Sequence, residues 1–248
     1  MLVQGKTIAV TGAGKGIGRS CVEFFLEHGA NVVALTRSKE DILSLEKAFE
    51  DRNFSIFQGD VTARKDLEKL LNLGCEKFGQ IHGLVNNAGI RQRKKFFEIT
   101  EDDWENVIQS NLTSCFFSMQ VFAKHMAEKG GGSIINISSV AGILGLPDLS
   151  GYVSSKAGLI GLTKALATEL APQNVRVNVL CPAFVETSFA EDFKTKRPDL
   201  YRFTIDRTPM ARWGKPSEVT PLIAFLLSDF SNYITGGVYP VDGGWTAC

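Results

Sequence analysis

Short apolar runs rich in β-branched residues alternate with amphipathic stretches along the whole chain. The runs cover Thr7–Thr11, Asn31–Thr36, Ser55–Gln58, Ile81–Asn86, Ser133–Ser138, Val175–Cys181 and Gly237–Val241. Helical patterns follow most of them, for example from about Gly16, over about Gly151–Leu170 and near Pro216–Leu227. Parallel strands need a crossover connection, which a helix supplies. The sequence therefore predicts an α/β fold, a doubly wound seven-stranded parallel sheet with helices on both faces.

The length and continuity of the pattern indicate one domain. The chain has 248 residues, of which 44% are hydrophobic, and this is enough to bury a substantial core. No Pro/Ser-rich linker, low-complexity tract or internal repeat interrupts the alternation. Only the stretch 183–213 is less regular. We expect a single domain over residues 1–248, with a substrate lid at about 183–213.

Charge and cysteine content exclude several kinds of partner. Lys plus Arg and Asp plus Glu both number 27, so no basic field favours nucleic acid or anionic lipid. The five cysteines lack CxxC spacing, which predicts neither a disulfide framework nor a metal site. No segment reaches the roughly 18 apolar residues of a membrane span, and the amino terminus lacks a signal-like apolar run. We expect a cytoplasmic protein with a small-molecule partner, without nucleic-acid or membrane partners.

A glycine-rich turn follows the first predicted strand directly. It reads Thr11-Gly12-Ala13-Gly14-Lys15-Gly16-Ile17-Gly18 and leads into a predicted helix. Glycines permit a tight turn and let backbone N–H groups and the helix amino terminus approach a pyrophosphate. Because a strand precedes the turn and a helix follows it, we interpret it as the dinucleotide site of a Rossmann fold.

The end of the second predicted strand bears on the choice of dinucleotide. An NAD site usually carries an acid about 20 residues after the glycines, but the strand ends in Ala34-Leu35-Thr36-Arg37. Arg37, with Lys15 beside it, suits a 2′-phosphate. The alternative is that both are solvated loop residues. The sequence therefore predicts NADP(H) as the preferred cofactor, with NAD(H) as the alternative.

Two further turns are expected at the cofactor. Asp60-Val61 ends the third strand and is a candidate for the adenine edge. Asn87-Ala88-Gly89 follows the fourth strand, where a glycine lets the chain pass close to the cofactor. Each is also compatible with ordinary turn chemistry.

A tyrosine and a lysine lie four residues apart in the predicted helix at 151–170. Tyr152 and Lys156 share one helix face at this spacing. A neighbouring ammonium and an oxidised nicotinamide both stabilise a phenolate, which makes Tyr152 a candidate general acid/base. Such a pair alone also occurs by chance on surface helices.

Taken together, TGAGKGIG at 11–18, NNAG at 86–89, Asn111, Ser139 and the YxxxK of Tyr152–Lys156 resemble the short-chain dehydrogenase/reductase family over essentially the whole chain. The resemblance implies that Ser139 binds the substrate oxygen and Tyr152 exchanges its proton. Lys156 would bind the nicotinamide ribose and tune Tyr152, and Asn111 would hold a proton-relay water. It also implies that Pro182, Val185 and Thr187 contact the nicotinamide. Ala183 departs from the family's usual Pro-Gly, so the local loop either keeps negative φ or rearranges.

The substrate is left open between two readings. The segment Val140–Leu146, including Leu144, is apolar, and Phe184 and Phe189 begin the lid, which favours a hydrophobic ketone or acyl chain. The run Arg91-Gln92-Arg93-Lys94-Lys95 resembles gluconate 5-dehydrogenases, in which case Arg91 or Arg93 would bind an anionic substrate. A solvated loop explains the same run equally well.

Particular residues bear on a second relative and on a function other than catalysis. The chain also resembles 3-oxoacyl-carrier reductases, but the rim positions expected to carry arginines for an acidic carrier protein are Lys129 and Thr168. A non-catalytic dinucleotide-binding sensor or scaffold is the alternative to an enzyme. The resemblance further implies a homo-oligomer, tetramer or dimer, formed through helices around Trp104–Met126 and Gly151–Leu170.

Overall fold

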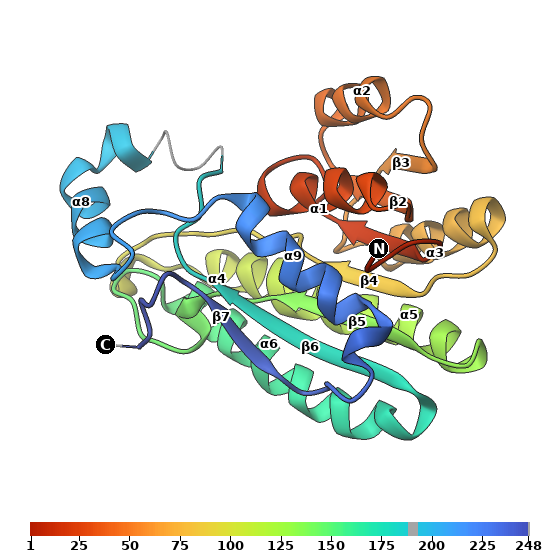
Figure 1. The fold of residues 1–248 in the computed structure, drawn as a ribbon. Helices are drawn as coiled ribbons and strands as arrows, with labels where there is room; N and C mark the ends of the chain where they lie inside the picture. The colour runs from red at the N-terminus through yellow and green to blue at the C-terminus, as the bar shows by residue number, and fades with distance from the viewer. Residues whose placement is uncertain (188–192, 248) are drawn as a thin grey trace.

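A computed structural model describes residues 1–187 and 193–247. Within these residues, seven strands form a single sheet in the order β3-β2-β1-β4-β5-β6-β7, with every neighbouring pair parallel (Figure 1). The strands are β1 (Thr7–Thr11), β2 (Asn31–Thr36), β3 (Phe54–Gln58), β4 (Gly83–Asn86), β5 (Gly132–Ile137), β6 (Val175–Pro182) and β7 (Val238–Val241). The predicted doubly wound sheet is confirmed, and the predicted bounds of β1 and β2 are those observed.

Helices cover both faces of the sheet (Figure 1). The α-helices are α1 (Gly16–Glu27), α2 (Lys39–Ala48), α3 (Arg64–Phe78), α4 (Glu101–Ile108), α5 (Ser114–Glu128), α6 (Ser150–Leu170), α8 (Pro198–Arg207) and α9 (Pro216–Leu227). Short 3-10 turns are η1 (Phe96–Glu98), η3 (Val140–Gly142), η4 (Ala171–Gln173) and η5 (Asp229–Ser231), and η2 (Gln109–Thr113) is a π-helical turn. None of the helices in the described part of the chain is long and apolar enough to cross a membrane.

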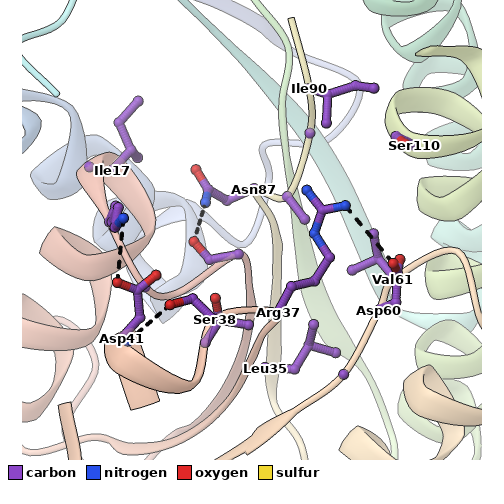
Figure 2. A pocket seen from close by; sticks show the side chains of 18 of the residues that line it. Ile17, Leu35, Arg37, Ser38, Asp41, Asp60, Val61, Asn87, Ile90 and Ser110 are labelled. Atoms are coloured by element: carbon purple, nitrogen blue, oxygen red, sulfur yellow. Dashed lines mark hydrogen bonds and ion pairs between the residues drawn. The ribbon is translucent and has the colours of Figure 1, made fainter. Parts of the chain in front are cut away.

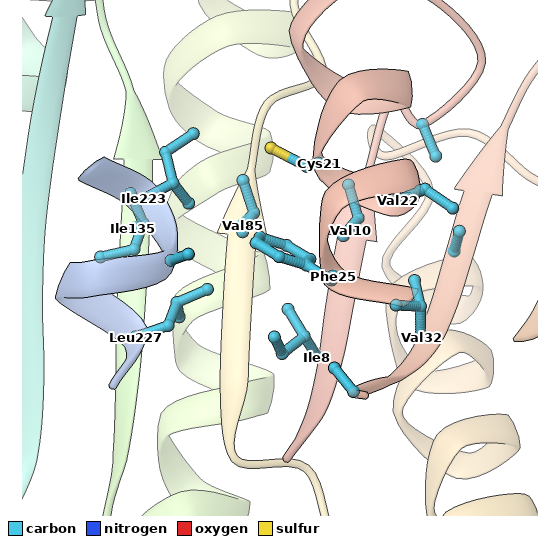
Figure 3. Packing of buried hydrophobic residues seen from close by; sticks show 14 of the residues in the cluster. Ile8, Val10, Cys21, Val22, Phe25, Val32, Val85, Ile135, Ile223 and Leu227 are labelled. Carbon is cyan, nitrogen blue, oxygen red and sulfur yellow. The ribbon is translucent and has the colours of Figure 1, made fainter. Parts of the chain in front are cut away.

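Alternate residues of the central strands build two separate cores. Ile8 and Val10 of β1 belong to the cluster with α1, α2 and α9, whereas Ala9 between them belongs to the cluster with α3, α5 and α6. Figure 3 shows the first core, where Phe25 of α1 and Ile223 of α9 pack over the sheet. Both faces of a parallel sheet are buried in this way, which is why its strands are almost continuously apolar.

The strand order creates the crevice in which the site lies. The chain moves outward from β1 through β2 to β3, then returns to place β4 on the other side of β1. The connections after β1 and β4 therefore diverge at the carboxyl ends of these strands. In open α/β sheets, ligands bind at this switch point.

Two stretches differ from the sequence expectation. The irregular region 183–213 contains α8, which starts with Pro198 at its first turn, a position where the missing proline N–H has no cost. A π-helical turn joins α4 to α5, a distortion often found at functional sites. Phe189, predicted to begin the lid, lies outside the described residues.

Candidate active site

A cleft of about 480 Å³ opens at the switch point, along the carboxyl ends of β1, β2, β3 and β4. Figure 2 shows this cleft, with Ile17 from the first turn of α1, Arg37 from the segment after β2, and Asn87 and Ile90 from the segment after β4. Of the residues predicted to bind a cofactor, those that line it are Gly12, Gly14, Lys15, Gly16, Ile17, Arg37, Asp60, Val61, Asn87, Ala88, Gly89 and Thr187.

The glycine turn fits against its neighbours so closely that side chains would not fit. Gly12 has φ +65°, and a Cβ there would lie 2.8 Å from Ala88 Cα. A Cβ on Gly18 would meet the Gly12 carbonyl and lie 2.5 Å from Asn87 Nδ2. Gly18 therefore serves the packing of α1 behind the turn, whereas the other glycines expose their backbone to the cleft.

Hydrogen bonds fix the turn after β4 to the glycine turn. Thr11 Oγ1 accepts from Asn87 N at 3.1 Å and from Ala88 N at 3.2 Å, and Asn87 Nδ2 donates to the Gly12 carbonyl at 2.9 Å. The amino terminus of α1 points into this region, and its N-cap, Lys15, makes no side-chain capping bond. Free N–H groups at a helix amino terminus attract phosphate.

The two basic residues predicted to bind a 2′-phosphate each face an acid. Lys15 Nζ lies 3.7 Å from Asp41 Oδ1, and Arg37 Nη1 lies 4.0 Å from Asp60 Oδ2 (Figure 2). The Asp41 carboxylate also packs against Gly14. Asp41 was not predicted at this site, although Ser38, whose Oγ accepts a hydrogen bond from Asp41 N, is a typical helix-capping residue at this position.

A second cavity, of about 230 Å³, continues from the cleft toward β5 and β6. The residues that line both are Ile17, Asn87, Gly89, Ile90 and Thr187. Ser139, Tyr152 and Lys156 line the second cavity, as do Pro182 and Val185. The structure thus brings three of the four predicted catalytic side chains to the end of the cofactor cleft.

Tyr152 and Lys156 project from one face of α6. The Lys156 ammonium lies 5.8 Å from the centre of the Tyr152 ring, and Lys156 as a whole is only 5% exposed. Its Nζ donates to the Ile137 carbonyl at 2.8 Å, which fixes it at the end of β5. Ser139, two residues further, accepts from Ala141 N with its Oγ at 3.1 Å, so the hydroxyl hydrogen is available to a ligand.

Asn111 lies behind the cavity in the π-helical turn η2. Its Oδ1 accepts from Ile90 N at 2.7 Å, and its Nδ2 donates to the Ile90 carbonyl at 2.8 Å and to Ser155 Oγ at 3.1 Å. A Cβ on Gly89 would lie 3.0 Å from Asn111 Oδ1 and 3.5 Å from Lys156 Nζ. Through these hydrogen bonds, Asn111 holds the turn after β4 in place.

Aromatic side chains form the outer wall of the second cavity. Phe184 stacks on Trp213 at 5.3 Å between ring centres and contacts Trp245 at 5.1 Å. Phe184 and Trp213 line the cavity, as predicted for Phe184. Ala183 is not among the residues with positive φ in the described part of the chain, so the loop keeps an ordinary backbone there.

The other residues predicted to bind the substrate lie in different places. Arg91 lines the second cavity, whereas Arg93 and Leu144 lie outside its lining. Arg93 instead donates to the Pro147 carbonyl at 2.9 Å and lies 3.6 Å from Asp148. The expectation for Arg93 and Leu144 is therefore not supported by their positions.

The two residues interpreted as carrier-protein positions lie elsewhere as well. Lys129 directly follows α5 and lines a separate polar cavity at the amino ends of the strands. Thr168 lies in the last turn of α6, which leads through η4 into the start of β6. Neither residue lines the cavity that contains Tyr152, and their interpretation as rim positions for a carrier protein stays a prediction.

Comparisons with known proteins agree with this geometry. A family model described as enoyl-(acyl carrier protein) reductase matches residues 12–246. The 3-oxoacyl-[acyl-carrier-protein] reductase FabG of Thermotoga maritima is 41% identical, covering 98% of this chain and 99% of the relative. The 2-dehydro-3-deoxy-D-gluconate 5-dehydrogenase of Escherichia coli K12 is 34% identical, covering 99% and 97%.

A solved structure, described as ElxO with NADP bound, superposes with a TM-score of 0.92 at 31% identity and covers 98% of this chain and 99% of that one. Residues 12–246, which the family model matches, contain Gly12–Gly18, the turn after β4, and Ser139, Tyr152 and Lys156. The chain therefore belongs to the short-chain dehydrogenase/reductase family of oxidoreductases.

Proposed function

We propose that the protein is an NADP(H)-dependent oxidoreductase that interconverts a ketone and a secondary alcohol with Ser139, Tyr152, Lys156 and Asn111. The observation that carries the proposal is the continuity of the two cavities. A dinucleotide cleft leads directly to a pocket that holds a phenol, an ammonium and a hydroxyl. A site that only senses a dinucleotide has no need of these three groups together.

The cleft fits a dinucleotide because its floor is backbone. The Gly12 turn and the open amino terminus of α1 suit a pyrophosphate. Arg37 and Lys15 would bind the 2′-phosphate, exchanging their contacts with Asp60 and Asp41 for a doubly charged group. The binding of NADP by a relative of similar fold supports this choice. Asp41 beside Lys15 is the feature that keeps NAD(H) as the alternative.

The protein's own side chains handle the proton and the developing charge. Bound NADPH supplies the hydride. Ser139 donates a hydrogen bond to the substrate oxygen, and Tyr152 transfers a proton to that oxygen as charge develops on it. Lys156 holds the ribose and places its ammonium 5.8 Å from the centre of the Tyr152 ring. Asn111 fixes the turn at Ile90 and, by the family resemblance, also holds a relay water.

The test is turnover by the purified protein with NADPH and a panel of simple ketones, 3-oxoacyl thioesters and keto sugar acids. Loss of nicotinamide absorbance with at least one class is expected, and it should require both protein and ketone. NADPH that binds without any turnover across the panel would support the sensor and contradict the proposed chemistry.

We further propose a homo-oligomer, tetramer or dimer, that uses α4, α5 and α6. Trp104 of α4 and Phe116 of α5 are 44% and 41% exposed, and large exposed apolar side chains favour association. Light scattering of the purified protein tests this, with a mass above that of one chain expected. The cytoplasmic location and the lid at 183–213 stay predictions.

A further inference from the structure

The basic run after β4 divides into residues with different partners. Gln92 Nε2 donates to Asp103 Oδ1 at 2.6 Å, and Lys94 Nζ donates to Asp103 Oδ2 at 2.5 Å. Arg93 is held by Pro147 and Asp148. These three side chains anchor the loop to α4 and to the segment before α6. The run is therefore not a uniformly solvated loop.

Arg91 points in a different direction from its neighbours. It is half-buried and lines the cavity that also contains Ser139 and Tyr152. Its guanidinium carbon lies 5.9 Å from the centre of the Phe193 ring, which is itself 4% exposed. The contacts of Gln92, Arg93 and Lys94 hold the loop in place, and the Arg91 side chain lines the second cavity.

Charged groups among the described residues act on the Arg91 guanidinium. Burial lowers the pKa of the Arg91 guanidinium, the neighbouring Tyr152 opposes that shift, and Arg93 and Arg197 add to it. Arg93 and Arg197 likewise act on each other, and Asp148 offsets Arg93. A partly desolvated guanidinium beside two further arginines gains from a bound anion, because arginine pairs with a carboxylate through two parallel hydrogen bonds.

The size of the cavity limits what carries that anion. Its volume is about 230 Å³, and the residues predicted to contact the nicotinamide are part of its wall. Once the ring is in place, the remaining room suits a small molecule. Phe184 and Trp213 line the wall and suit its carbon chain.

We infer that the substrate is a small ketone or secondary alcohol that carries a carboxylate, and that Arg91 binds this carboxylate while Ser139 and Tyr152 bind the reacting oxygen. This inference rests on the proposed ketone–alcohol chemistry. According to this inference, the enzyme prefers a keto acid to a neutral ketone. It also prefers the keto acid to a thioester on a carrier protein, because the charges of the carrier protein would lie outside the cavity.

The experiment compares matched substrates that differ only in charge. Wild-type protein with NADPH is assayed with 4-oxopentanoate, 5-oxohexanoate and a keto-hexonate, each beside its methyl ester. The variants are Arg91→Met, Arg91→Lys and Lys95→Met; Lys95 belongs to the same run but is exposed and outside the cavity. The measured quantity is the ratio of kcat/KM for an acid to that for its ester.

For at least one pair, the wild-type ratio should exceed one, and Arg91→Met should lower it about 100-fold, as expected when a buried charge pair loses one partner. Arg91→Lys should fall in between, because it keeps the charge without the planar fork. Lys95→Met should keep the wild-type ratio. A general effect of Arg91 on Tyr152 would lower both rates together and leave the ratio unchanged.

Ratios of one or less for every pair, or a ratio that Arg91→Met does not change, would overturn the inference while leaving the ketone chemistry intact. Absence of turnover with every acid and ester would count against the proposed function instead. In that case, calorimetric titration of the protein–NADPH complex with pentanoate and pentanamide tests whether Arg91 binds a carboxylate. Pentanoate should bind more tightly, and only to the protein that retains Arg91; equal binding of the two would contradict the inference.

Discussion

The cofactor cleft and the second cavity share part of their lining but are built from different parts of the chain. The cleft is formed by backbone in short turns, above all at Gly12 and Ala88, which Thr11 locks together. The cavity is formed by side chains from distant segments, such as Arg91 and Trp213. Backbone turns fix what all dinucleotides have in common, whereas side chains can vary with the substrate. Changes in one half should therefore affect binding of one ligand more than of the other.

Replacement of Tyr152 by Phe should have the largest effect, because it should lower turnover strongly and leave NADPH affinity nearly unchanged. The change removes the proton donor but leaves the ring and Lys156 in place, so turnover should fall by about 10³-fold or more. NADPH affinity, measured by fluorescence titration, should stay within a few-fold of wild type. Activity like that of wild type would remove Tyr152 from its catalytic role.

Replacement of Gly12 should mainly lower the affinity for NADPH, in contrast to replacement of Tyr152. Gly12→Ala places a methyl group against Ala88 and forces alanine to φ +65°. NADPH affinity should drop about 10-fold or more, together with about 1 kcal/mol of stability from the backbone strain. Fluorescence titration and urea unfolding measure the two effects.

Gly79→Ala is the matched control for this change. Gly79 also has positive φ, +85°, but a Cβ there has nothing within 4 Å. It should lose a similar amount of stability and keep its NADPH affinity. Equal loss of affinity in both variants would mean that strain, and not close approach, explains the effect at Gly12.

The charged end of the cleft should determine which dinucleotide is used. Arg37→Asp should shift the ratio of kcat/KM for NADPH over NADH toward NADH by about 100-fold, because an acid there repels the 2′-phosphate. Asp41→Asn should move the ratio the other way by a few-fold, since it relieves the competition for Lys15. An unchanged ratio in Arg37→Asp would show that another residue binds this phosphate.

The smallest effect is expected far from both ligands, at the amino ends of the strands. His82 Nδ1 accepts from Thr7 N at 3.0 Å, and burial lowers the pKa of His82. Protonation breaks this bond, and the unfolded chain takes up the proton more readily. Stability from this group is therefore fully present above about pH 6.5, the ordinary histidine value, and is lost as the pH falls below it.

Urea unfolding at pH 7 and pH 5 tests this effect. The midpoint of wild type should fall on acidification, and that of His82→Asn, which keeps an acceptor but does not titrate, should fall less. Identical falls in both proteins would assign the pH dependence to other groups. NADPH affinity should be the same in both proteins at pH 7.

The sequence predicts the cofactor half better than the substrate half for a physical reason. A turn such as Gly12–Gly18 has its geometry set by neighbouring residues, so its pattern is visible locally. Arg91 and Arg93 are two residues apart and equally basic, yet only their tertiary neighbours, Tyr152 and Asp148, assign them different places. Local spacing could not make that distinction.

The same limit explains the other differences. Asp41 reaches the cleft only because α2 begins where β2 ends, and an acid in the first turn of a helix is common for reasons unrelated to a cofactor. Lys129 was interpreted by resemblance as a rim position for a carrier protein, and the structure adds that it follows α5 and lines a polar cavity at the amino ends of the strands. Positions taken over from relatives need the topology before they can be assigned to a site.

Transfer of a labelled hydride tests the central claim most directly. The protein is incubated with NADPH carrying deuterium at both C4 positions and with the ketones of the panel, and the products are analysed by mass spectrometry. We expect a secondary alcohol that carries one deuterium on its carbinol carbon, formed by wild type and not by Tyr152→Phe. Bound NADPH with no labelled alcohol from any ketone would contradict the claim that this site reduces a carbonyl group.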